Sequence, residues 1–150
     1  AQNLPDNLRL RVVTNSIEIA EELRKRDNIS VILLGGEMDD KGYCRDAFAI
    51  DMVRKLRFDK CFITAAGISA SFGLSIQRSQ AISFVGAVIE SAREVVGLFP
   101  TEKMGVESIV SICPAEELNV LITDWNAAEE DVAEFREKGI DVVVVEQVTE

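Results

Sequence analysis

The stretch Leu10-Arg11-Val12-Val13-Thr14-Asn15-Ser16 runs from an apolar strand pattern directly into the start of a helix. Residues 10–13 form a short run with branched side chains, which favours a β-strand. Asn15 and Glu18 resemble a capping box, which indicates that the helix begins directly after the strand. The apolar face of this predicted helix is formed by Ile19, Ala20 and Leu23. A strand joined so closely to a helix is the repeating unit of α/β folds.

The same alternation continues along the rest of the chain. Apolar runs predict further strands at residues 29–34, 61–63, 94–99, 120–122 and 142–145. Residues 64–73 are predicted to form a loop. Helical spacing predicts three more helices, one capped by Asp46, one over residues 81–92, and one capped by Asn126 and ended by Gly139. Strands and helices that alternate in this way predict a mainly parallel sheet.

The last predicted strand, Val142-Val143-Val144-Val145, lacks the alternation of apolar and polar residues that a half-exposed strand shows. Such runs are typical of parallel strands that are covered on both faces. We therefore predict an α/β fold of three layers, α/β/α, with a mainly parallel sheet of about six strands. With 150 residues and 47 % hydrophobic content, the chain fits a single domain over residues 1–150.

Charge and composition narrow the possible functions. The chain carries 16 basic and 26 acidic residues, and its net charge of −10 would repel a nucleic-acid backbone. We therefore expect this chain alone not to bind DNA. The N-terminus has no signal-peptide pattern and no apolar run is long enough to span a membrane, so we expect a soluble protein in the cytoplasm.

The chain contains no histidine and only three cysteines, Cys44, Cys61 and Cys113, none of which belongs to a CxxC pair. We therefore predict no metal site and no cofactor. Without histidine, Ser-His-Asp and Cys-His mechanisms lack their general base, so we predict no catalytic residues of those kinds. Any proton transfer would fall to carboxylates or lysine.

Candidate ligand-binding residues stand where predicted strands end. In an open parallel sheet, ligands bind beyond the carboxyl ends of the strands. Thr14, Asn15 and Ser16 follow the first strand and open a helix, where backbone N–H groups favour an anion such as phosphate. Ordinary helix capping explains the same residues. Gly35 and Gly36 follow the second strand and permit close approach of a ligand, but a tight turn explains them equally well.

Two further strand ends carry candidates. A loop of small residues after the third strand leaves room for a ligand, and it includes Gly67, Ile68 and Ser69. Lys103 follows the next strand and can supply a positive charge to a phosphate or a sugar hydroxyl, and Arg45 is a weaker candidate of the same kind. The alternative explanations are a plain connecting loop and solvated surface charges.

Several short motifs resemble, in order, successive motifs of the C-terminal sensor domain of the DeoR family of transcriptional regulators. They are Val12–Ser16, Ile32–Glu37, Phe58–Ile63 with Gly67–Ser69, Gly73–Ser75, Lys103–Gly105 and Val120–Asp124. The resemblance implies the fold shared by glucosamine-6-phosphate deaminase (NagB), ribose-5-phosphate isomerase (RpiA) and the CoA transferases. It also implies that a winged-helix DNA-binding domain precedes the sensor domain in a longer protein, upstream of the residues present here.

The family resemblance further implies a binding module and not an enzyme. A phosphorylated sugar or sugar derivative would act as the effector and would change the affinity of the longer protein for its operator. We expect a homo-oligomer without a membrane partner. The residues predicted to bind the effector are Thr14, Asn15, Ser16, Gly35, Gly36, Arg45, Gly67, Ile68, Ser69 and Lys103.

Two positions depart from the family pattern. This chain has Ala66 where relatives carry an acidic or amide residue, and Pro100 where an aspartate is common. A pocket with fewer polar partners would select a different or less hydroxylated metabolite. Two alternatives therefore stay open: a sugar-phosphate isomerase or deaminase of the same fold that uses Glu102 and Lys103, and an oligomerisation domain that binds no ligand.

Overall fold

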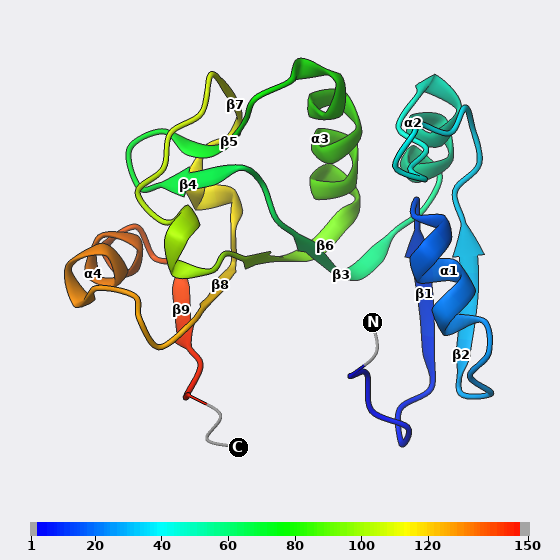
Figure 1. Cartoon of the computed structure of the whole chain (residues 1–150), viewed down its shortest axis with the longest axis horizontal. Coiled ribbons are helices and arrows are strands. Elements are labelled where there is room, and N and C mark those ends of the chain that lie inside the picture. Colours follow the sequence, from blue (N-terminus) through cyan, green and yellow to red (C-terminus); the bar gives the residue numbers. More distant parts are fainter. Residues whose placement is uncertain (1–2, 148–150) are drawn as a thin grey trace. The chain divides into compact units, whose positions relative to one another are not determined.

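The step from strand to helix predicted at residues 10–16 is present in the computed structural model, which describes residues 3–147 (Figure 1). β1 (Leu10–Thr14) ends three residues before α1 (Ile17–Leu23) begins. The chain divides into two units, Ala1–Leu56 and Arg57–Glu150. The single domain predicted over residues 1–150 stays a prediction, and its outermost residues lie outside those that the structure describes.

The first unit is built on one pair of parallel strands. β1 pairs with β2 (Ile29–Leu33), with Leu10 opposite Ile29 and Thr14 opposite Leu33. α1 packs against both strands, and α2 (Ala47–Arg54) follows a hairpin-like loop in which Met38 pairs with Cys44. The buried apolar side chains of this unit are Ala20, Leu23, Ile29, Leu34, Cys44, Ala49 and Val53.

The capping residues of this unit are only partly as predicted. Asp46 caps α2, and its Oδ1 accepts a hydrogen bond of 3.1 Å from the backbone N of Ala49. The predicted capping box of Asn15 and Glu18 is wrong, because Ser16 is the N-cap of α1. The chain leaves the extended conformation only after Ser16, so the side chain that meets the helix start is one residue later than the pattern indicated.

The second unit contains a four-stranded parallel sheet in the order β3-β6-β8-β9. Its strands are β3 (Phe58–Ile63), β6 (Ala92–Leu98), β8 (Val120–Thr123) and β9 (Asp141–Val144). A separate antiparallel sheet has the order β4-β5-β7 and is formed by β4 (Gly67–Ser69), β5 (Gly73–Ile76) and β7 (Val110–Cys113). The parallel pairings in the two units confirm the predicted α/β class with mainly parallel strands.

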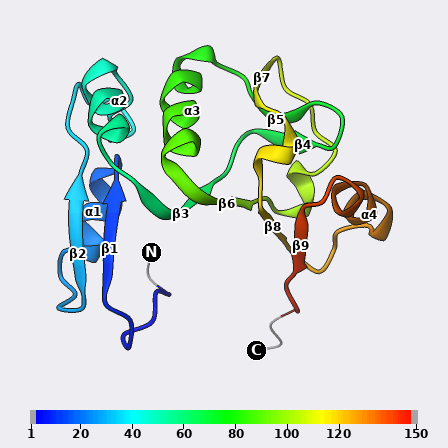
Figure 2. The ribbon, with the colours of Figure 1, turned by 180° about the vertical axis from the view of Figure 1, so that it is seen from behind.

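Helices cover one side of the four-stranded sheet. α3 (Ile82–Ser91) packs against β3 and β6, and α4 (Glu129–Glu137) packs against β9 (Figures 1 and 2). Three short 3-10 helices connect the elements: η1 (Ser79–Ala81), η2 (Thr101–Lys103) and η3 (Ala115–Glu117). The core includes Cys61, Ile63, Val95, Phe99, Leu121, Val132, Phe135 and Val142. Within residues 3–147, no helix is long and apolar enough to cross a membrane.

Three details of the second unit correct the sequence prediction. Residues 64–73, predicted as a loop, contain β4 and the turn into β5. β7 was not predicted, because a run of four residues with an internal serine gives only a weak strand pattern. The predicted cap of α4 at Asn126 is wrong, since the helix begins after Ala128 without a capping side chain.

The sequence indicated that the valine run at the C-terminal end is covered on both faces. This prediction is wrong. Val142 is buried with 7 % exposure, whereas Val143 is 41 % exposed and Val144 is 37 % exposed. β9 lies at the edge of the sheet, next to β8 alone. Val143 stands in register with Ile122, on the face opposite to Val142. Only the face that carries Val142 is packed against the core.

This difference between two neighbouring valines predicts a difference in stability. Val142→Ala leaves a cavity in the core and should lower the free energy of unfolding by about 1 to 3 kcal/mol. Val143→Ala removes the same atoms from an exposed position and should cost less than about 0.5 kcal/mol. Urea unfolding followed by circular dichroism measures both. Equal costs for the two variants would contradict the one-sided packing of β9.

Candidate functional site

The predicted phosphate loop, Thr14-Asn15-Ser16, forms the start of α1. Thr14 Oγ1 accepts a 3.1 Å hydrogen bond from the backbone N of Ser16, and Ser16 Oγ accepts a 3.4 Å bond from the backbone N of Ile19. The backbone N of Ile17 donates to the carbonyl of Gly42 at 3.1 Å. Thr14 and Ser16 are buried. These amides and hydroxyls already serve the capping structure, so an anion would have to replace some of these bonds.

The same loop is joined to the hairpin that carries Arg45. Asn15 Nδ2 donates to the carbonyl of Cys44 at 3.0 Å, and the backbone N of Cys44 donates to the carbonyl of Asn15 at 3.1 Å. The structure thus brings two predicted contacts, Asn15 and Arg45, close together from positions thirty residues apart in the sequence. Asn15 is half-buried.

Arg45 itself is engaged within the hairpin. Its guanidinium pairs with Asp39 Oδ2 at 2.7 Å and lies over the ring of Tyr43, 4.3 Å from the ring centre. The pKa of Asp39 is lowered, first by the hydrogen bond from the backbone of Tyr43 and further by the bond from Lys41 and the charge of Arg45. Arg45 therefore stabilises the hairpin as well as offering a positive charge.

The two glycines after β2 have different environments. Gly36 has a φ of +143°, and a Cβ atom there would lie 2.2 Å from Asp46 Oδ1, so the cap of α2 requires glycine. Asp46 Oδ2 also accepts a 2.9 Å bond from the backbone N of Glu37, which holds this turn closed. At Gly35 a Cβ atom would meet nothing within 4 Å. Gly35 is therefore exposed with open space beside it, while Gly36 is required by the cap of α2.

In the second unit, Lys103 lies on a loop that is fastened to the ends of the parallel strands. Thr101 follows β6, and its backbone N and Oγ1 donate to the two carboxylate oxygens of Asp124 at 2.7 and 2.6 Å. Asp124 follows β8 directly. Lys103 Nζ donates to Oγ1 of Thr64, the first residue after β3, at 3.2 Å. Residues that follow three neighbouring strands thus meet at the carboxyl edge of the sheet.

The chain after Lys103 is also fixed, here by the β4-β5 hairpin. The backbone N of Gly105 donates to the carbonyl of Ile68 at 2.8 Å. Glu107 accepts hydrogen bonds from Ser69 Oγ at 2.7 Å and Ser71 Oγ at 2.8 Å. A Cβ atom at Gly67 would lie 2.3 Å from the carbonyl oxygen of Val106. The three predicted contacts Gly67, Ile68 and Ser69 therefore hold the lysine loop in place.

Two carboxylates near Lys103 are held in their charged form by hydrogen bonds. Hydrogen bonds from the side chain and backbone of Thr101 lower the pKa of Asp124, and those from Ser69 and Ser71 lower the pKa of Glu107. Carboxylates with lowered pKa values are weak proton acceptors at neutral pH. Burial raises the pKa values of Cys61 and Cys113 to about 11, so neither thiol is a reactive nucleophile.

The predicted ligand contacts did not include Thr64, Asp124 and Glu107, although Thr64 begins the loop of small residues and Asp124 ends the motif Val120–Asp124. Thr64 and Asp124 each stand directly after a strand, and this position alone was a usable signal. Glu107 gave no such signal, because its partners Ser69 and Ser71 are more than thirty residues away in the sequence.

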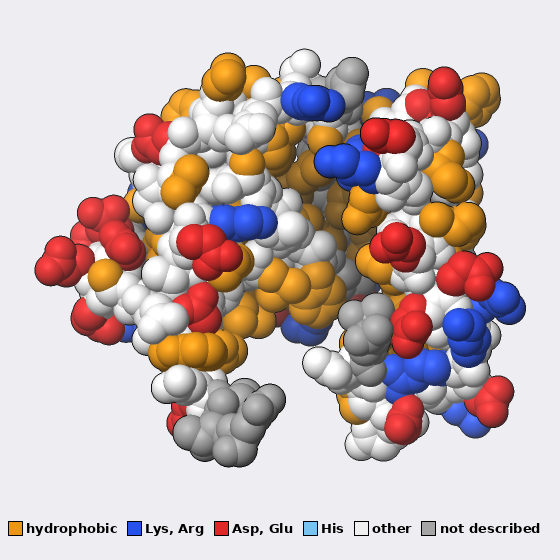
Figure 3. Space-filling model, in the orientation of Figure 1, with side chains coloured by type: hydrophobic (Ala, Val, Ile, Leu, Met, Phe, Trp, Pro, Cys, Tyr) orange, Lys and Arg blue, Asp and Glu red, His pale blue; other side chains and the backbone are white. Residues whose placement is uncertain are grey.

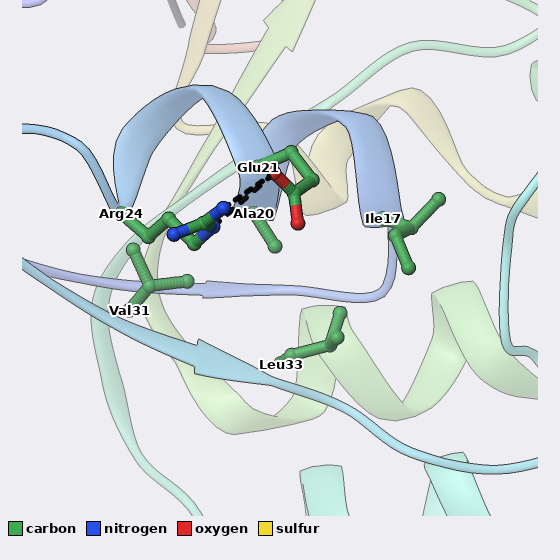
Figure 4. A pocket seen from close by; sticks show the side chains of 6 residues that line it. All are labelled: Ile17, Ala20, Glu21, Arg24, Val31 and Leu33. Carbon is green, nitrogen blue, oxygen red and sulfur yellow. Dashed lines mark hydrogen bonds and ion pairs between the residues drawn. The ribbon is translucent and has the colours of Figure 1, made fainter.

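A pocket of about 210 Å³ lies between α1 and β2 in the first unit (Figure 4). Figure 4 shows the apolar side chains of Ile17, Val31 and Leu33 around it, with the ion pair of Glu21 and Arg24 at its rim. Its lining includes none of the predicted ligand residues. Its mainly apolar walls do not suit a phosphate.

The chain is similar to a family of sensor domains and to several transcriptional regulators. The family model described as the DeoR C terminal sensor domain matches residues 1–125. The chain is 29 % identical over 147 residues to the HTH-type transcriptional regulator GolR of Listeria innocua, covering 97 % of this chain and 58 % of the relative. It is 29 % identical over 137 residues to the HTH-type transcriptional repressor GlcR of Bacillus subtilis, covering 91 % and 53 %.

A third relative is the glycerol-3-phosphate regulon repressor of Escherichia coli, which is 26 % identical over 126 residues. The match covers 83 % of this chain and 50 % of the repressor. The chain thus spans about half the length of the curated relatives it matches.

The bond between Thr101 and Asp124 predicts a pH dependence of stability. The folded pKa of Asp124 lies below its ordinary value of 3.8, so its stabilising effect is complete above that value and is lost as the pH falls below it. The urea midpoint of the natural chain should exceed that of Asp124→Asn at about pH 6, and the gap should shrink below about pH 4. A gap that stays constant, or widens on acidification, would show that Asp124 is not held as a charged acceptor.

Proposed function

Since this chain belongs to the family of DeoR C-terminal sensor domains, we propose that it senses a phosphorylated sugar or sugar derivative and thereby controls DNA binding by a longer regulator. The observation that carries the proposal is the position of Lys103. Lys103 is half-buried and lies at the carboxyl edge of a parallel sheet, on a loop fastened on both sides. Ligands of open α/β sheets bind at this edge.

The relatives support a phosphorylated effector. One of them is named for glycerol 3-phosphate, a small phosphate ester that carries hydroxyl groups. A fixed lysine suits such a ligand, because an ammonium group has three donors and a full positive charge. The surrounding loop contributes Gly67, Ile68 and Ser69, which we propose as neighbours of the ligand in addition to their task in holding the loop.

For the predicted contacts of the first unit we propose a separate anion-binding site, within that unit, at the start of α1. Asn15 is half-buried at the carboxyl end of β1, Gly35 has open space beside it, and Arg45 brings a positive charge to the same hairpin. Thr14 and Ser16 flank Asn15, and Gly36 follows Gly35. We include these three residues in the proposed anion site for that reason.

The proposed role is regulatory and not catalytic. The chain has no histidine, and Asp124 and Glu107, the carboxylates that fasten the lysine loop, accept hydrogen bonds that lower their pKa values. An isomerase needs a carboxylate able to take up a proton near neutral pH. We therefore expect no turnover of ribose 5-phosphate or glucosamine 6-phosphate by this chain.

DNA binding is proposed for a different part of the longer protein. The net charge of this chain is −10, and acidic side chains gather over α4, whose first turn carries Glu129, Glu130 and Asp131 (Figure 3). Such a surface repels a phosphate backbone. We propose that the effector shifts the population of two arrangements of a homo-oligomer, and that these arrangements differ in operator affinity.

Replacing Lys103 tests the proposed function. Titration calorimetry with glycerol 3-phosphate, glucose 6-phosphate and fructose 6-phosphate should show binding by the natural chain for at least one compound. Lys103→Ala should weaken that binding about tenfold or more, since a charged hydrogen bond contributes about 1.5 to 3 kcal/mol.

Lys138→Ala is the matched control for this experiment. Lys138 lies in the same unit and pairs with Glu116 at 2.5 Å, at the end of α4. Its removal should leave the affinity within about twofold. Absence of binding to any phosphorylated sugar at millimolar concentration, or equal losses in both variants, would contradict the proposal.

Replacing Asn15 tests the phosphate contacts of the first unit. In a Lys103→Ala background, Asn15→Ala should further weaken the binding of inorganic phosphate, because Asn15 is proposed as an anion contact of the first unit alone. Thermal melting of the variant separates loss of the bond to Cys44 from loss of ligand contact. Unchanged affinity for phosphate, with unchanged melting, would show that Asn15 is not an anion contact.

A further inference from the structure

Thr64 and Lys103 form a hydrogen bond at the surface, outside the packed core. Thr64 is exposed and is the first residue after β3, while Lys103 closes η2, thirty-nine residues later in the chain. The strands that precede them, β3 and β6, are hydrogen-bonded neighbours in the sheet, with Ile63 opposite Gly97. The sheet therefore sets the distance between the two side chains.

The hydrogen bond between them determines what they can offer to a ligand. Lys103 Nζ donates to Thr64 Oγ1 at 3.2 Å, so the threonine oxygen acts as an acceptor within the pair. The threonine O–H is left to donate elsewhere, and the ammonium group keeps two further N–H donors. The pair thus presents three donor hydrogens and one remaining lone pair of the threonine oxygen. This excess of donors favours an acceptor oxygen as partner, and the positive charge favours an anionic one.

Within residues 3–147, the hydrogen bonds of the carboxylates of Asp124 and Glu107 go to residues other than Thr64 and Lys103. Asp124 accepts from Thr101 and from the backbone N of Asn126, and Glu107 accepts from Ser69 and Ser71. Both carboxylates are engaged in fastening the loop on either side of Lys103. The donors of the pair are therefore available to a ligand.

We propose that Thr64 and Lys103 together bind one anionic oxygen of the effector, and that Thr64 selects for it by holding the lysine in place. This inference rests on the proposed function and assigns a new residue to it. Thr64 supplies a polar contact in the loop where Ala66 offers none. The pair takes a phosphate or carboxylate oxygen in preference to a hydroxyl group.

Variants at Thr64 test the inference with two probes, inorganic phosphate and glycerol 3-phosphate. Thr64→Val keeps the size of the side chain but removes the hydroxyl, and it should weaken both probes about three- to tenfold, the effect of one neutral hydrogen bond. Thr64→Ser restores the hydroxyl and should bind within about twofold of the natural chain. Because residue 64 is exposed, thermal melting should confirm that both variants fold.

A double-variant cycle shows whether Thr64 acts through Lys103. In a Lys103→Ala background, Thr64→Val should cause a clearly smaller loss than it does in the natural chain, since part of its effect acts through Lys103. Ser111→Ala is the control, because it removes a hydroxyl bonded at 3.1 Å to the carbonyl of Phe72 in the same unit. That change should leave the affinity for both probes within about twofold.

The outcomes separate this inference from the proposed function. If glycerol 3-phosphate binding depends on Lys103 but not on Thr64, the inference is wrong and the proposed function stands. If phosphate binding depends on both residues while no phosphorylated sugar binds more tightly than phosphate itself, the donor pair stands and the proposed effector class is wrong. Fully additive losses at Thr64 and Lys103 would also overturn the inference.

Discussion

The carboxylate of Asp124 is the constraint on which the second unit's candidate site depends. It accepts two short hydrogen bonds from Thr101, at 2.7 and 2.6 Å, and a third of 3.0 Å from the backbone N of Asn126. These bonds tie the end of β6 to the end of β8. η2 begins at Thr101, so the direction in which Lys103 leaves the sheet follows from this tie. Charged hydrogen bonds of this kind are among the strongest that a folded chain forms.

The sequence patterns that could be interpreted correctly are those with a local physical cause. The apolar runs that became β1, β2, β3, β6, β8 and β9 owe their strand character to their own branched side chains. Asp46 could be predicted as a cap because capping involves residues only three positions apart. Parallel pairing follows because each helix between two such strands returns the chain in the same direction.

The elements that escaped prediction depend on partners distant in the sequence. β4 consists of glycine, isoleucine and serine, and it becomes a strand because it pairs with β5. β9 is exposed on the face opposite to Val142, where Phe62 of β3 and Leu98 of β6 are exposed as well, and no run of valines reveals which face is packed. The same limit applies to function. Gly67 and Ser69 were predicted as ligand contacts, and the structure gives them a second task against Val106 and Glu107.

The central claim is that an effector binds where Lys103 stands, at the carboxyl edge of the parallel sheet. The most direct measurement is an NMR titration of the ¹⁵N-labelled chain with glycerol 3-phosphate, glucose 6-phosphate and fructose 6-phosphate. We expect saturable shifts, with at least one of these compounds, in the backbone signals of Thr64, Thr101, Lys103 and Gly105. No shifts with any of them, or shifts confined to the apolar pocket between α1 and β2, would contradict it.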